Sequence, residues 1–155
     1  MRRGASTVHG PMWRTLRWIL FGLAAAGAVG VVARVLMRLV ALSVGDGEFT
    51  MMGSVFIVLI YVVAMAPLAV AAALTRRPWR WLFGAGGSVF LLFPAIGVAG
   101  EEIGHVGDVP WWRWVWLVAA SIGVFATLLA APLATVWAVD RQRRTSEVEL
   151  ELVTA

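Results

Sequence analysis

Four long apolar runs, separated by short polar segments, constrain this chain more than any other feature of its sequence. The hydrocarbon core of a bilayer is about 30 Å thick, and a helix of about 20 apolar residues crosses it. Lipid offers the backbone no hydrogen-bond partner, so each run has to be helical. The sequence therefore predicts an all-α integral membrane protein, a bundle of four transmembrane helices.

The chain of 155 residues is 61% hydrophobic, well above the roughly 45–50% of a soluble domain. Its length fits one membrane domain over residues 1–155. The predicted segments are a cytoplasmic tail over 1–12, transmembrane helices over about 14–42, 53–75, 80–99 and 111–139, an outer loop over 100–110, and a cytoplasmic tail over 140–155.

The distribution of arginine predicts the orientation. All 13 basic residues are Arg, and cytoplasmic loops of membrane proteins carry an excess of basic residues. With both termini in the cytoplasm, ten of the 13 fall in inner segments: Arg2, Arg3, Arg14, Arg17, Arg76, Arg77, Arg80, Arg141, Arg143 and Arg144. Tryptophan clusters flank the runs at both predicted interfaces, where amphipathic rings prefer to lie. We therefore expect a multi-pass protein of the plasma (inner) membrane with both termini cytoplasmic.

A short sequence match indicates a possible internal repeat. Ala66–Ala69 and Ala131–Ala134 both read Ala-Pro-Leu-Ala, and Arg76 and Arg141 follow at the same distance from each proline. The offset is close to one helical hairpin, which predicts two hairpins in parallel orientation. The alternative is chance, because these residues are common in such helices. Prolines inside the predicted helices also predict kinks, at Pro67, Pro94 and Pro132.

Arg34 and Arg38 interrupt the outer end of the first run and are the best candidates for a functional site. Four residues apart, they share one helix face. Gly27, Gly30 and Ala41 lie on the same face, and small residues let another helix approach closely. The two arginines are therefore expected to face the bundle. Three interpretations stay open: interfacial anchors, a buried ion pair, or a site for an anionic ligand.

Glu101 and Glu102 follow the third run at the same outer level and are the natural counterions of these arginines. A pair with Arg34 predicts that the outer ends of the first and third helices are neighbours. Glu102, His105 and Asp108 also have the spacing of a weak metal site, although a carboxylate metal centre in a bundle needs more ligands than these. Gly100, Gly104 and Gly107 favour a solvated loop instead: together with Glu101 they make this segment polar and rich in glycine.

The ends of the fourth run carry two further predictions. Asp108-Val109-Pro110 is typical of a helix start. After Val139 the chain becomes charged, and residues 147–153 alternate polar and apolar side chains as a strand would. This segment is too short for a sheet of its own, so it either pairs with a partner or, as we expect, is disordered.

The sequence favours a non-catalytic protein that works by helix packing, as a subunit or accessory factor, with a second copy or another membrane protein as its partner. We expect no cofactor and no nucleic-acid partner, since the basic residues flank apolar runs. One alternative is a small transporter or channel for an anionic solute that uses Arg34 and Arg38. Another is a membrane enzyme on a lipid or isoprenoid substrate that uses Glu101 or Glu102. In topology the chain resembles short four-helix membrane proteins of bacteria.

Overall fold

A computed structural model of the protein describes residues 11–44, 51–104 and 110–154. These residues form α1 (Pro11–Val44), α2 (Met51–Leu74), α3 (Arg80–Gly104) and α4 (Trp111–Thr154). All four are long and apolar enough to cross a membrane. The predicted all-α fold with four potential transmembrane helices is therefore confirmed.

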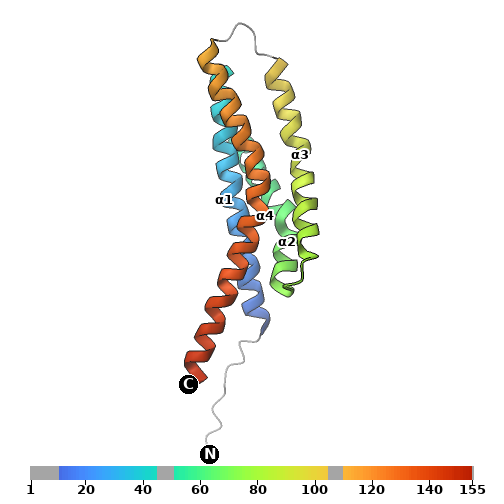
Figure 1. The fold of residues 1–155 in the computed structure, drawn as a ribbon, viewed down its shortest axis with the longest axis vertical. Coiled ribbons are helices and arrows are strands. Elements are labelled where there is room, and N and C mark those ends of the chain that lie inside the picture. The colour runs from blue at the N-terminus through green and yellow to red at the C-terminus, as the bar shows by residue number, and fades with distance from the viewer. Residues whose placement is uncertain (1–10, 45–50, 105–109, 155) are drawn as a thin grey trace, which may run out of the picture.

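The four helices form a bundle (Figure 1). Helices α2 and α4 contact one another as well as both of the other helices. Helices α1 and α3 each pack against both α2 and α4 but make hardly any contact with one another. The most extensive contact joins α1 to α4, which run side by side in opposite directions. The expected neighbourhood of the first and third helices is therefore wrong for the described residues, because α2 and α4 lie between them.

Small residues bring the helices close together. A Cβ atom on Gly22 of α1 would lie 2.8 Å from the Val139 side chain and 3.2 Å from Ala69. A Cβ on Gly87 of α3 would lie 2.6 Å from the carbonyl oxygen of Ala64. Such close approach is how helices associate in lipid, where burial of apolar surface gives no net driving force. The largest side chains that are fully enclosed are those of Met65, Leu68, Leu91, Val139 and Thr135.

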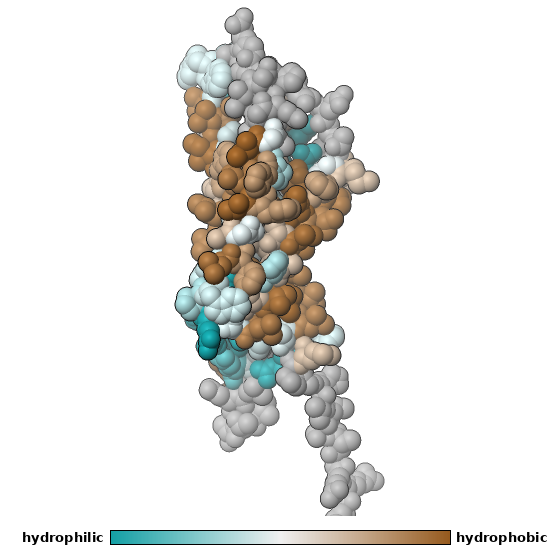
Figure 2. Space-filling model, turned by 90° about the vertical axis from the view of Figure 1, so that its right-hand side faces the viewer, coloured by the Kyte–Doolittle hydropathy of each residue, from teal (hydrophilic) through white to brown (hydrophobic). Residues whose placement is uncertain are grey.

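The outer surface of the bundle is strongly apolar. Large side chains such as Leu59, Phe93 and Leu129 are more than half exposed. Figure 2 shows this hydrophobic surface along much of the bundle, with hydrophilic residues gathered toward the end where α1 begins and α4 ends. We call this the basic end, defined by residues 12–18, 75–81 and 137–148; the other is the opposite end. A soluble bundle would not present such a surface to water.

The turn between α2 and α3 follows from its sequence. The backbone N–H of Arg77 donates to the Thr75 hydroxyl at 3.1 Å, and the Arg80 N–H donates to the Arg77 carbonyl at 3.2 Å. Pro78 suits this position because it cannot continue the preceding helix and fits the first turn of the next. The short turn forces α2 and α3 to be antiparallel neighbours.

Two helices continue further than the sequence indicates. Helix α3 includes Gly100 and ends at Gly104, where a loop was expected. Helix α4 runs to Thr154, so the expected disorder of residues 147–153 is wrong. Once a helix is nucleated, each further residue adds a hydrogen bond, and a glycine costs only about 1 kcal/mol. At about 1.5 Å per residue, the 44 residues of α4 exceed the bilayer core by a wide margin.

The two Ala-Pro-Leu-Ala segments occupy different environments. Leu68 is fully buried, whereas the matching Leu133 is 58% exposed. Pro67 is exposed and Pro132 is buried. The helix arrangement has the connectivity that two parallel hairpins would have, but these matched side chains do not share an environment. The duplication therefore stays a prediction.

Candidate functional site

The face of α1 that carries Arg34 packs against α2. A Cβ on Gly30 would lie 3.1 Å from the Tyr61 Cβ, and one on Gly27 would lie 3.4 Å from Val62. One turn further along, Arg34 is half-buried, and its Nε donates to the Ser54 hydroxyl at 2.9 Å. The expectation that this face looks into the bundle is confirmed, and the helix it meets is α2.

Arg38 lies one turn beyond Arg34 and is also half-buried. Both arginines are therefore neither enclosed in the core nor fully exposed. Such a side chain can bury its stem and keep its charge near water. The three interpretations of this pair (anchors, ion pair or anion site) stay predictions.

The acidic candidates fall at the limit of the described residues. Glu101 and Glu102 belong to the last turn of α3, but the positions of their side chains are not described, nor are His105 and Asp108. Pairing of Arg34 with either glutamate, a metal site at Glu102, His105 and Asp108, and an enzymatic role of Glu101 or Glu102 therefore stay predictions. Among the described residues, no group of three potential ligands could hold a metal ion.

The three prolines lie inside continuous helices. Pro94 borders a small cavity of about 50 Å³ between α1, α2 and α3. Pro132 faces α3, where a Cβ on Gly84 would lie 3.1 Å from its ring. Pro67 faces outward and lines a groove between α2 and α3. The predicted kinks stay predictions, but each proline lies at a helix–helix contact or at a cavity.

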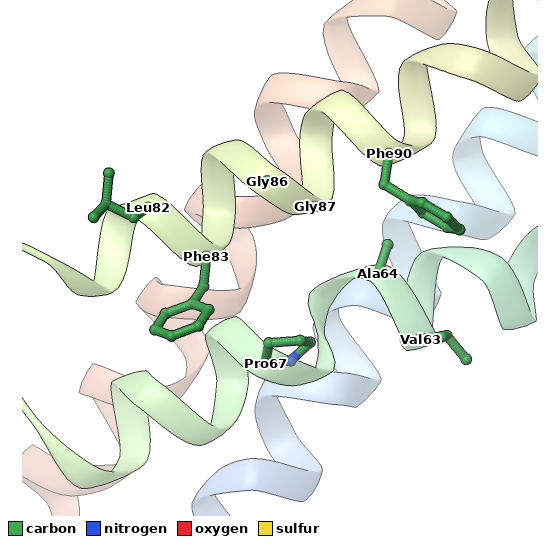
Figure 3. Close-up of a pocket in the computed structure, with 8 residues that line it drawn as sticks. All are labelled: Val63, Ala64, Pro67, Leu82, Phe83, Gly86, Gly87 and Phe90. Carbon is green, nitrogen blue, oxygen red and sulfur yellow. The ribbon is translucent and has the colours of Figure 1, made fainter.

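This α2–α3 groove, about 340 Å³ in volume, is shown in Figure 3. Its floor is Gly86 and Gly87 of α3, and a Cβ on Gly86 would meet nothing within 4 Å. Phe83 and Phe90 project from α3 on either side of the two glycines. On α2 the groove is lined by Val63, Ala64 and Pro67. Proline has no N–H, so Pro67 deprives the Val63 carbonyl of its usual helical donor. The groove is an apolar depression on the lipid-facing side of the bundle.

Polar contacts at the basic end tie α4 to α3 and α2. Arg80 of α3 forms a bidentate pair with Asp140 of α4, with N–O distances of 3.0 and 3.1 Å. The Arg80 side chain is only 11% exposed. Arg143 of α4 donates to the Ala72 carbonyl at 3.1 Å, near the C-terminus of α2. A helix leaves its last carbonyls unpaired, and a guanidinium there also complements the helix dipole.

The same region ties α4 to α1. The Trp18 ring of α1 lies 5.1 Å below the guanidinium of Arg143 and 5.7 Å from that of Arg14. Its indole N–H points to the Ser146 hydroxyl at 3.4 Å, and Arg17 donates to Gln142 at 3.2 Å. Sequence reasoning read these arginines as orientation signals only. The available clue was the mixture of acid, amide and base directly after the fourth apolar run.

The middle of the bundle is closed by side chains that satisfy one another. The Tyr61 and Thr127 hydroxyls are 2.6 Å apart and buried, and Thr127 also donates to the Val124 carbonyl. Ser88 of α3 donates to the Leu128 carbonyl of α4 at 2.7 Å. Met65 and Leu68 fill the space around them without exposure. In the described core, buried hydrogen bonds and enclosed apolar side chains therefore lie together, between the two ends of the bundle.

Comparison of the chain with protein families, curated proteins and solved structures finds no match.

Proposed function

We propose that the protein is a non-catalytic membrane subunit or accessory factor that works by packing against a neighbouring transmembrane helix. The observation that carries this proposal is the tight packing of the described core. Met65 and Leu68 are fully enclosed, and the buried Tyr61 and Thr127 hydroxyls bond to each other. A bundle packed in this way leaves its outer surface as the place for interaction. We further propose that the basic end faces the cytoplasm of a plasma membrane, as the arginine distribution predicts.

The α2–α3 groove supports this proposal and suggests where the neighbour packs. Gly86 presents backbone and open space where another residue would present a side chain. Small residues at such positions allow close helix approach, the main source of association in lipid. The carbonyl of Val63, freed by Pro67, offers an acceptor to a Ser or Thr hydroxyl on the incoming helix. The partner we propose is a second copy of the chain or another membrane protein.

Cross-linking in native membranes tests the proposal. The sequence contains no cysteine, so a single introduced thiol reports one position. We expect Gly86→Cys to cross-link to a neighbouring chain through a short maleimide–diazirine reagent, whose photoreactive end needs no thiol on the partner. Leu129→Cys, on the lipid-exposed surface of α4, is the matched control. A product of twice the mass identifies a second copy, and another discrete mass identifies a different partner. Equal and weak products at both positions, from a protein that is monomeric in nanodiscs, would refute the packing function.

The contact between Arg34 and Ser54 favours a second candidate, a small transporter or channel for an anionic solute. The guanidinium is half-buried between α1 and α2, and a charge at this depth is unusual without a role. Proteoliposomes loaded with an anion-sensitive dye test this candidate. Flux that falls in Arg34→Gln and persists in Arg17→Gln, at the basic end, would support transport, and dye signals equal to those of empty liposomes would exclude it.

A further inference from the structure

A second surface pocket, at the opposite end of the bundle, combines a positive charge with apolar walls. It has a volume of about 330 Å³ and lies between α1 and the start of α4. Its lining residues are Leu39, Leu42, Trp112, Arg113 and Trp116. We propose that this pocket binds one phospholipid molecule, with the phosphate at Arg113 and an acyl chain along the leucines and Trp116.

The pocket has a rigid frame. Next to it, α1 and α4 meet through the buried side chains of Val40, Leu117 and Ala120. Deeper in the bundle, a Cβ on Gly123 would lie 3.0 Å from Leu36. This tight seam fixes the spacing of the two helices, so the pocket walls are held in place before any ligand arrives. Preorganised walls reduce the entropy lost on binding.

The charge in the pocket is available for an anion. The Arg113 guanidinium lies over the Trp112 ring, 5.2 Å from its centroid, a favourable cation–π contact. Among the residues that the structure describes, Arg113 forms no ion pair. A guanidinium matches phosphate oxygens with two parallel hydrogen bonds, and these charge-assisted bonds are the strong ones.

The rest of the pocket requires an apolar occupant. The apolar walls are about half exposed or more: Leu39 and Leu42 on α1, and Trp116 on α4. Trp116 belongs to the tryptophan-rich first turns of α4, and the two leucines lie beside these turns. Tryptophan prefers the headgroup level of a bilayer, so this pocket lies at the boundary of headgroups and acyl chains. A phospholipid of that leaflet carries both a phosphate and a hydrocarbon chain. A free anion would leave the apolar walls uncovered. This proposal does not depend on the proposed packing function.

Photolabelling tests the proposal. Purified protein in nanodiscs is labelled with a phospholipid that carries a diazirine in its acyl chain, and with a diacylglycerol probe of the same chains without phosphate. Mass spectrometry then locates the labelled residues. We expect the phospholipid to label Leu39, Leu42 and Trp116 roughly three- to tenfold more than the diacylglycerol, the effect of one charge-assisted contact at a partly exposed site.

Variants separate the charge from the walls. Arg113→Gln is expected to lower phospholipid labelling to the diacylglycerol level. The control is Arg141→Gln. It removes a guanidinium that lies 5.0 Å from the centre of the Trp137 ring, on the same helix but outside this pocket. Leu42→Trp fills the cavity without changing the charge, and it should also abolish labelling. This variant tests the proposal even if Arg113→Gln fails to fold.

Each of several results would overturn the proposal. These are equal labelling by the two probes, labelling that Arg113→Gln leaves unchanged, displacement of the probe by millimolar inorganic phosphate (a soluble anion site), and a cross-link from this pocket to another chain (a partner helix). Retained labelling in Leu42→Trp would place the lipid elsewhere and overturn the assignment as well.

Discussion

The close approach of α3 to α2 at Gly87 makes a sharp prediction about stability. A Cβ at this position would lie 2.6 Å from the Ala64 carbonyl oxygen and 2.7 Å from the terminal methyl of Met65. The flexible methionine can move, but the carbonyl belongs to the α2 backbone and cannot. Gly87→Ala should therefore push the two helices apart. Gly86, the adjacent residue, meets nothing within 4 Å and supplies a matched control, Gly86→Ala (Figure 3).

The difference between the two variants isolates the steric term. Replacing a helical glycine by alanine stabilises a helix by about 0.5–1 kcal/mol, and this gain is common to both positions. Inserting a methyl group into a packed contact costs about 1–3 kcal/mol. The gain cancels in the comparison, so Gly87→Ala should be about 1–3 kcal/mol less stable than Gly86→Ala. For a chain of this size, this corresponds to a difference in Tm of roughly 2–12 °C.

Thermal unfolding in one detergent, followed by the loss of the monodisperse size-exclusion peak, measures this difference. Unfolding by SDS titration, followed by circular dichroism, gives the free energy independently. Gly86→Ala should unfold at or slightly above the temperature of the wild type, and Gly87→Ala below it. Equal stability of the two variants would refute the close contact between α2 and α3, because that contact is the reason to expect the added methyl group to cost more at Gly87 than at Gly86.

Two further predictions concern polar contacts. Asp140→Asn should lower the free energy of unfolding by about 1–2 kcal/mol in SDS titrations, because the mostly enclosed Arg80 keeps its charge but loses its carboxylate. Glu147→Gln breaks an ion pair in which both side chains are more than half exposed, so it should change the free energy of unfolding by less than about 0.5 kcal/mol. Similar effects of the two substitutions would contradict this reasoning. Tyr61→Phe should cost about 0.5–1.5 kcal/mol, and a double-mutant cycle with Thr127→Val should give a coupling of similar size. A coupling of zero would mean that the two hydroxyls do not bond to one another.

The spans could be predicted from the sequence because lipid imposes a simple rule. A long apolar run must be helical, and its length decides whether it can cross a bilayer. The same reasoning placed Gly27, Gly30 and Arg34 on one face of α1, which packs on α2. Helical periodicity is a local property, so local sequence was enough to obtain this result.

The neighbours of each helix could not be predicted in the same way. Which helix faces Arg34 depends on the packing of the whole bundle, and the sequence offered Glu101 and Glu102 as partners by charge alone. The structure shows Arg34 bonded to a hydroxyl, that of Ser54 at the start of the next helix, and the pairing with either glutamate stays a prediction. The last part of α4 was missed for a related reason. Its alternating pattern indicates a strand, but it follows an established helix and is anchored by contacts of Gln142 and Ser146 with α1.

Small and polar residues make the close contacts between the helices, and while Met65 and Leu68 fill the core, many other large apolar side chains face outward. Gly22 and Gly87 set the helix spacing, and Arg80 and Arg143 connect the helix ends. This is the reverse of a soluble domain, and it follows from a solvent that is itself apolar. In such a protein, the interior carries the information for the fold, and the large exposed residues are left for recognition. The search for function therefore belongs on the surface, where the α2–α3 groove and the Arg113 pocket each depart from a uniform lipid-facing wall.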